Sequence, residues 1–209
     1  LPMTLMNALH YSPMQAGLAM IPSMGVMFCI APQAGKFADR FGPRWPITVG
    51  PCVSALAYVI FANTHEAAYV PGMLLPIALM GVGFGTWVTP LTSAVMSAVD
   101  EVNAGIASGV NNAVARLAQL LAIAVLGIVA TIAFGSALDG YLIDANISQG
   151  AIQSLAGERA KLGGMQLPDG FPEAFAQVAR QAIRLAFRDA FATVCYVSAG
   201  LGLGSSFLG

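Results

Sequence analysis

The segment GKFADRFGPR, residues 35–44, joins two long apolar stretches of the sequence, at about 16–34 and 46–62. It carries three basic residues and one acidic residue: Lys36, Arg40, Arg44 and Asp39. Gly42 is free to adopt a positive φ, and Pro43 fixes the direction in which the chain leaves. The segment therefore predicts a tight turn between two helices, each long enough to cross a lipid bilayer.

The composition of the whole chain agrees with this interpretation. Of the 209 residues, 57% are hydrophobic and only 9% are charged, whereas a soluble domain has about a quarter charged residues. The net charge of −1 provides no basic field for nucleic acid. Three cysteines and two histidines show no metal-binding spacing, and no set of residues indicates catalysis. We expect an all-α membrane protein that is not an enzyme and holds no metal.

Five apolar segments are long enough to be transmembrane helices. They are 16–34, 46–62, 69–99, a helix from about 104 whose apolar core is 120–134, and 190–209. Residues 1–15 predict the end of a preceding span and an outer loop, because 1–9 is apolar but too short to cross. Residues 16–134 thus hold four transmembrane helices with a motif loop at 35–45, and the chain is expected to be a piece of a larger protein.

The basic residues of the 35–45 loop predict its orientation, since short cytoplasmic loops are rich in Lys and Arg. The side of residue 1 then lies outside and that of residue 209 lies in the cytoplasm. Residues 135–189 form a long outer loop, in which apolar residues recur at helical spacing between 173 and 189. We expect an amphipathic helix on the membrane surface there, with a solvated charged face as the alternative.

Glycine and proline are frequent within the predicted spans. Gly81, Gly83 and Gly85 fall in the third span, and Gly200, Gly202 and Gly204 in the fifth. Small residues let helix backbones approach closely in lipid. This pattern is typical of transporter helices that bend and rock, although a rigid bundle is compatible with it.

Polar residues inside the spans are candidate functional groups. Arg116 lies on the fourth span, with Asn112 and Gln119 on the same helical face and Asn111 beside them. One interpretation is that this group faces a translocation pathway. The alternative is that Arg116 extends to the cytoplasmic membrane interface or pairs with Asp100 or Glu101. On the third span, Thr86, Trp87 and Thr89, with Tyr58 of the second, could line a cavity for flat cationic molecules. Interface anchoring of the aromatic residues is the alternative.

Three motifs resemble those of a known family. Gly35, Asp39, Arg40, Gly42 and Arg44 match the G-x-x-x-D-R-x-G-x-R signature of major facilitator superfamily transporters. The entry YSPMQAGL at 11–18 and the stretch AGIASGVNN at 104–112 are similar to segments of the fourteen-helix drug:proton antiporter branch. One departure is that Ala115 stands where relatives often have an Arg, and Arg116 follows it.

The resemblance implies a partial major-facilitator-type helical bundle, the C-terminal part of a proton-coupled multidrug exporter that works by alternating access. The resemblance also implies that the protein lies in a bacterial inner membrane. Its expected partners are the lipid bilayer, the missing N-terminal helices of the same transporter, and lipophilic substrates, cationic ones among them. No cofactor is implied; a proton gradient would drive transport through carboxylates of the N-terminal half. The 35–45 loop would be a cytoplasmic latch. A non-transporting membrane module and a carrier of another small solute are the alternatives.

Overall fold

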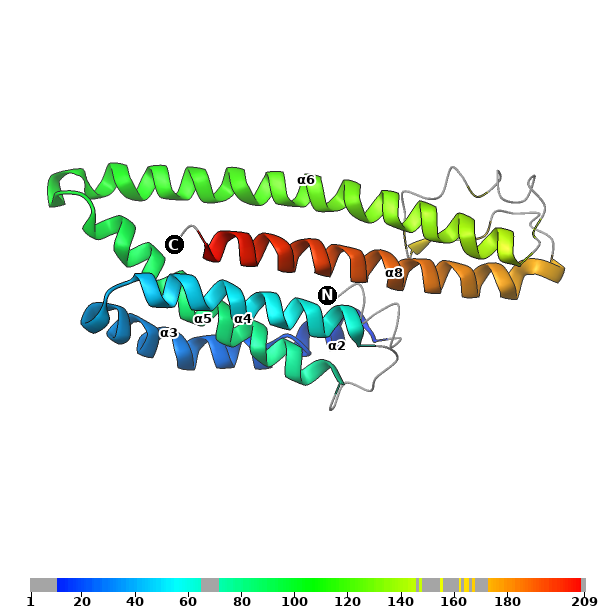
Figure 1. The fold of residues 1–209 in the computed structure, drawn as a ribbon, viewed down its shortest axis with the longest axis horizontal. Helices are drawn as coiled ribbons and strands as arrows, with labels where there is room; N and C mark the ends of the chain where they lie inside the picture. Colours follow the sequence, from blue (N-terminus) through cyan, green and yellow to red (C-terminus); the bar gives the residue numbers. More distant parts are fainter. Residues whose placement is uncertain are drawn as a thin grey trace. The chain divides into compact units, whose positions relative to one another are not determined.

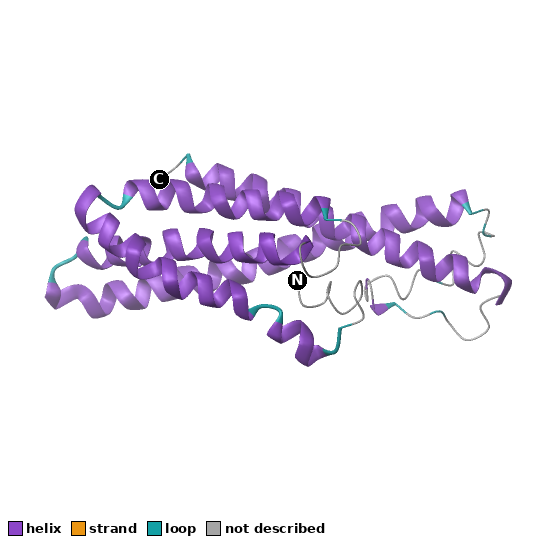
Figure 2. Cartoon of the chain, turned by 90° about the horizontal axis from the view of Figure 1, so that it is seen from below, coloured by secondary structure: helices purple, strands orange, loops and turns teal. Residues whose placement is uncertain are grey.

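The computed structural model describes residues 11–64, 72–145, 147, 155, 162, 164, 165, 167 and 173–207. Every regular element in these residues is helical, as Figures 1 and 2 show, which confirms the all-α class. The elements are α2 (Pro13–Leu18), α3 (Ile21–Phe41), α4 (Arg44–Asn63), α5 (Leu74–Ser97), the short helix η2 (Glu101–Asn103), α6 (Ala104–Asp144) and α8 (Glu173–Ser206). The predicted tail at 1–9 and the end of the chain at 208–209 lie outside the described residues.

The chain forms two compact units. The bundle unit comprises Gly17–Ile123 and Cys195–Gly209, and the hairpin unit comprises Leu1–Ala16 and Ala124–Val194. In the described part of the chain, four helical segments are long and apolar enough to cross a membrane: Pro13–Phe41, Arg44–Asn63, Leu74–Ser97 and Ala104–Asp144. They correspond to the first four predicted spans, and the predicted fifth is the C-terminal part of α8.

Helix α2 begins with a capping box. The Ser12 side chain accepts a hydrogen bond from the Gln15 backbone N–H at 3.2 Å, and the Gln15 side chain accepts one from the Ser12 N–H at 3.0 Å. This reciprocal pair satisfies two donors that the first turn of a helix leaves free. The spacing of Ser and Gln in the segment YSPMQAGL therefore has a local structural reason.

Close contacts at glycines bring α5 against α3. A Cβ atom built on Gly81 would clash with the carbonyl oxygen of Ser23, and one on Gly85 would lie 3.0 Å from the carbonyl oxygen of Met27. One turn further, Thr89 lies beside Gly35. The paired positions rise together along both helices, so α3 and α5 run parallel. Their backbones approach closely because each of these three contacts involves a glycine, which has no side chain.

The opposite face of α5 meets α4. A Cβ on Gly50 would lie 2.7 Å from the Cβ of Trp87, and a Cβ on Gly83 would clash with the hydroxyl oxygen of Ser54. Here the paired positions run in opposite directions, so α4 is antiparallel to α5. Gly81 and Gly85 thus serve one interface of α5 and Gly83 the other, which explains why three glycines alternate with larger residues in this span.

The turn between α3 and α4 is shorter than the predicted loop at 35–45. Helix α3 continues to Phe41, and α4 starts at Arg44, so only Gly42 and Pro43 connect them. Gly42 has φ +89°, as predicted, and its N–H donates to the Ala38 carbonyl at 2.8 Å. No strong helix breaker occurs between Pro32 and Gly42, so the helix simply continues through the charged residues.

The hairpin unit corrects the predicted loop at 135–189. Helix α6 extends ten residues beyond 134, and Phe134, Leu138 and Leu142 are completely buried at a spacing of one turn. They pack against Ile183 and several alanines of α8, among them Ala179, and Figure 1 shows α6 running beside α8. Isolated Gly135 and Gly140 do not end α6, because this apolar stripe stabilises the helix by packing.

The amphipathic segment also differs from the prediction. Residues 173–189 are continuous with the predicted last span in the single helix α8, and their apolar face is buried in the hairpin unit rather than free for a membrane surface. Ala179, Ala182 and Ala186 form this face, whereas Val178 is exposed. Arg180 and Arg184 are exposed, which agrees with the alternative of a solvated charged face.

A hydrogen bond between Tyr141 and Asp189 joins the two helices of the hairpin unit. The Tyr141 hydroxyl donates to a carboxylate oxygen of Asp189 at 2.6 Å, and Arg188 lies 3.4 Å from the other oxygen of the same carboxylate. Hydrogen bonds to a charged acceptor are short and comparatively strong. The bond joins the last turns of α6 to the residue just before the predicted last span, 190–209.

The packing of the hairpin unit predicts the effect of a pair of neighbouring substitutions. Leu142 has no exposed surface, whereas 64% of Ile143 is exposed. We expect Leu142→Ala to destabilise the protein by about 2–5 kcal/mol, because it removes methyl groups from a closed core. Ile143→Ala is the matched control and should have little effect. Thermal melting of the purified full-length protein tests this; equal melting temperatures for both variants would contradict the packed extension.

Candidate functional site

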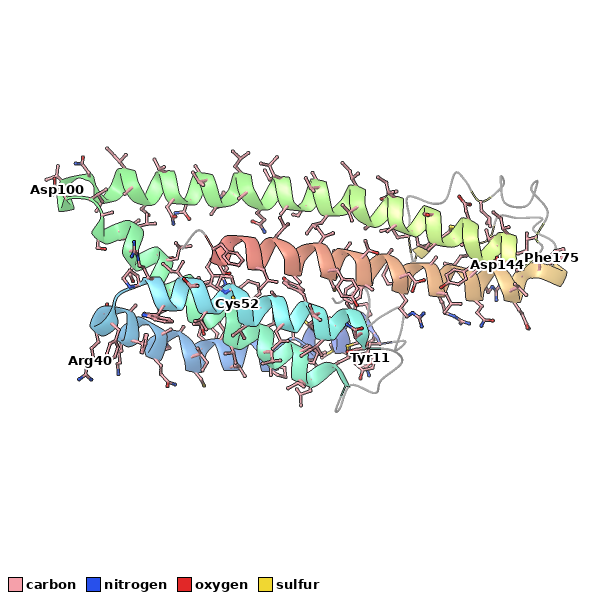
Figure 3. All side chains as sticks on the ribbon, in the orientation of Figure 1. Tyr11, Arg40, Cys52, Asp100, Asp144 and Phe175 are labelled. Carbon is pink, nitrogen blue, oxygen red and sulfur yellow. The ribbon has the colours of Figure 1, made fainter. Side chains whose placement is uncertain are left out.

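The five motif residues lie on both sides of the α3–α4 turn. Gly35, Asp39 and Arg40 occupy the last turns of α3, Gly42 forms the turn, and Arg44 is the first residue of α4. Arg40 lies over the ring of Phe41, at 5.6 Å from its centroid, and Phe37 stacks near Phe41 at 4.8 Å. Figure 3 shows Arg40 at the end of α3, pointing away from the helices. The charged residues of the motif are all exposed.

Asp39 occupies an electrostatically unfavourable position. The C-terminal end of a helix carries partial negative charge, so a carboxylate in the last turn is repelled. Within the described part of the chain, no hydrogen bond or ion pair offsets this repulsion for Asp39. Nor does its side chain cap α4: the N-cap position of that helix is Pro43, which makes no side-chain cap, and no described hydrogen bond joins Asp39 to the first turn of α4. Among the described residues, Asp39 therefore neither caps α4 nor pairs with a neighbouring Arg, and it is available for a partner elsewhere.

The polar residues of α6 share one face, as predicted. Asn112, Arg116 and Gln119 are all exposed, and Asn111 beside them is half-buried. None of the described residues from 104 to 133 is buried, so this part of α6 has no covered face. Among the described side chains, no ion pair joins Arg116 to Asp100. The side chain of Glu101, the other predicted partner, lies outside the described residues.

The predicted residues of α5 do not act together. The Thr86 hydroxyl donates to the Val82 carbonyl of its own helix at 2.7 Å, and Thr89 lies against Gly35 of α3. Trp87 faces α4 instead, where it packs on Gly50. Trp87 and Tyr58 line one cavity, whereas Thr86 and Thr89 are not among its lining residues.

A cavity of about 420 Å³ lies within the bundle unit. Helix α4 contributes Ile47, Pro51, Ser54 and Tyr58, α5 contributes Phe84, Trp87 and Leu91, and the end of α8 contributes Gly202 and Ser205. None of these lining residues is charged. Seven of these residues were not predicted from the sequence, although those of α4 repeat at helical spacing and therefore share one face.

An apolar helical bundle with a charged turn between two membrane-length helices defines a multi-pass membrane protein, and similarity to known proteins agrees. The profile of the Major Facilitator Superfamily matches residues 1–123. The chain belongs to the major facilitator superfamily. The superfamily prediction is thus confirmed, and with it a partial helical bundle of that family.

Several curated relatives are named as drug exporters. "Multidrug resistance protein Stp" of Mycobacterium tuberculosis is 29% identical over 170 residues, which cover 77% of this chain and 31% of that protein. "Drug efflux pump JefA" of the same organism is 30% identical over 138 residues, covering 66% and 27%. "Tetracenomycin C resistance and export protein" of Streptomyces glaucescens is 29% identical over 144 residues, covering 68% and 27%. The chain thus spans about a third or less of the length of these relatives.

Proposed function

We propose that the chain is the C-terminal part of a secondary active transporter of the fourteen-helix branch, which exports drugs in exchange for protons. The observation that carries this proposal is superfamily membership together with similarity to proteins named for multidrug resistance, drug efflux and antibiotic export. Transport would proceed by alternating access, in which two helical halves rock about a central site. The bilayer and the N-terminal helices of the same protein are the partners of this part.

The α3–α4 junction is the proposed cytoplasmic latch. An exposed Asp39 in an unfavourable helix-end position would gain energy by pairing with a cationic group of the N-terminal half. If that pair forms in one state of the cycle and breaks in the other, it biases the equilibrium between the states. Lys36, Arg40 and Arg44 then favour a cytoplasmic location of the junction, with residues 135–189 on the outer side.

The uncovered part of α6 supports a pathway role for its polar face. Asn112, Arg116 and Gln119 are exposed on a helix that buries none of its described residues before Phe134. A charged residue facing lipid is unfavourable, so it is expected to face the bundle interior or water. We infer that the N-terminal half covers this face and that Arg116 lies beside the inner end of the substrate path.

Efflux of ethidium from cells that express the full-length protein in their inner membrane tests the proposal. We expect energised cells to extrude the dye and a protonophore to abolish extrusion. The chain alone, at an equal membrane level, should not extrude ethidium, because half of the transport path would be missing. Protonophore-resistant extrusion would contradict proton coupling. The absence of extrusion of ethidium and of any other drug tested would favour the non-transporting module.

A further inference from the structure

We propose that the cavity between α4, α5 and the end of α8 binds an uncharged, flat aromatic molecule that carries hydrogen-bonding groups. This site is separate from the polar face of α6, none of whose residues lines it. Binding there requires no proton gradient, so the inference stands independently of transport.

The size of the cavity suits a small molecule. Its volume of about 420 Å³ lies in the range of about 300–1,000 Å³ that is common for ligand sites. Its walls are held by close contacts at glycines. The side chain of Trp87 packs against Gly50, that of Ser54 packs against Gly83, and Gly202 of α8 lies close to the Pro51 carbonyl. A site whose walls are held in this way is preformed, which lowers the free-energy cost of binding.

Aromatic side chains form one wall. The rings of Phe84 and Trp87 have centroids 6.0 Å apart and are tilted by 44°, and Tyr58 lines the same cavity from α4. Aromatic pairs in offset or tilted geometry gain energy beyond the burial of their surface. A flat aromatic ligand would extend this cluster, whereas a flexible acyl chain would not use it.

The polar groups of the lining are hydroxyls and one indole N–H. The hydroxyls of Ser54 and Ser205 donate to carbonyls of their own helices, at 3.2 and 2.8 Å, so their oxygens remain as acceptors. Among the described residues, the Tyr58 hydroxyl and the Trp87 indole N–H have no hydrogen-bond partner, so both can donate to a ligand. The lining is largely apolar and includes a few residues able to donate or accept hydrogen bonds.

The absence of charge in the lining decides between ligand classes. A cation that enters this half-open, largely apolar cavity loses part of its hydration, and no lining carboxylate replaces it. Attraction to an aromatic face compensates only part of that loss. A neutral molecule such as a quinone meets no such penalty, so the cavity should prefer it over a flat cation of similar size.

Photolabelling of the purified full-length protein, without any gradient, tests the inference. The neutral probe is an azido-anthraquinone, and the cationic probe is ethidium monoazide. We expect the neutral probe to label peptides of α4, α5 and the end of α8. Ser205→Trp, which fills the cavity, should lower that labelling by about tenfold, equivalent to a tenfold weaker affinity. Labelling of the same peptides by ethidium monoazide should be weaker and insensitive to the substitution.

The matched control is Leu203→Trp on the same helix. Leu203 is 45% exposed, does not line the cavity, and is rotated by about 200° from Ser205 around the helix axis. Leu91→Trp fills the cavity from α5 and should repeat the loss if Ser205→Trp impairs folding. Equal labelling of Leu203→Trp and both filling variants would overturn the inference. So would stronger labelling by the cation, or displacement of the neutral probe by added phospholipid.

Discussion

Replacement of Gly81 by alanine is expected to destabilise the protein strongly. The added methyl group would collide with the backbone carbonyl of Ser23 on α3, and a backbone atom cannot move aside as the end of a flexible side chain can. Separation of α3 from α5 also disturbs the contacts at Gly85. Overpacking of this kind costs about 1–3 kcal/mol, and more where backbones must shift. Thermal melting of the purified full-length protein measures the loss.

Gly127→Ala is the control for Gly81→Ala. Gly127 also lies within a helix, but a Cβ atom there would meet no described atom within 4 Å. Alanine favours helix over glycine by about 1 kcal/mol, so this variant should melt at the wild-type temperature or above it. If both variants melted alike, close approach of α3 and α5 at Gly81 could not be what holds the bundle unit together.

Asp39→Asn is expected to have the largest effect on transport. The substitution keeps the size of the side chain and removes the charge that the proposed latch requires. Coupling between conformational states typically amounts to about 1–3 kcal/mol, so initial rates of ethidium efflux should fall by about tenfold or more. Stability should stay the same or rise, because the carboxylate lies at the unfavourable end of α3. Efflux rates at equal membrane levels, with melting temperatures, test both statements.

Two further variants separate the latch from a general effect of charge. Asp39→Glu retains the carboxylate and should recover much of the efflux rate. Asp100→Asn removes an exposed acid from the segment between α5 and α6, which Figure 3 shows at the same end of the bundle unit as Arg40. This variant should leave efflux unchanged. Equal efflux rates for Asp39→Asn and wild type would contradict the latch and leave the motif only a role in setting the membrane topology.

The sequence predicted the helices best where charged or proline-containing segments flank an apolar stretch. The second predicted span, 46–62, differs from α4 (Arg44–Asn63) by only a few residues. At the end of α6 the prediction was wrong, because Gly135, Asp139 and Gly140 have the composition of a loop. The decisive signal was the spacing of Phe134, Leu138 and Leu142, which becomes meaningful only when another helix can cover them.

The candidate site was predictable in part. The motif identified the α3–α4 junction, and helical spacing placed Asn112, Arg116 and Gln119 on one face. The cavity depends on which helices pack together, and the sequence alone does not provide that information. Gly50 and Trp87 illustrate the difficulty, since they are far apart in the sequence and yet their contact shapes the cavity wall. Without that contact, Trp87 could not be distinguished from the neighbouring threonines.

The central claim is that the chain belongs to a proton-driven exporter. It is tested most directly by ethidium movement in liposomes that contain the purified full-length protein, under an imposed pH gradient. We predict transport that starts when the gradient is applied, stops when a protonophore collapses it, and is nearly absent in Asp39→Asn. Ethidium movement independent of the gradient, or no movement of ethidium or other lipophilic drugs by folded protein, would contradict the account.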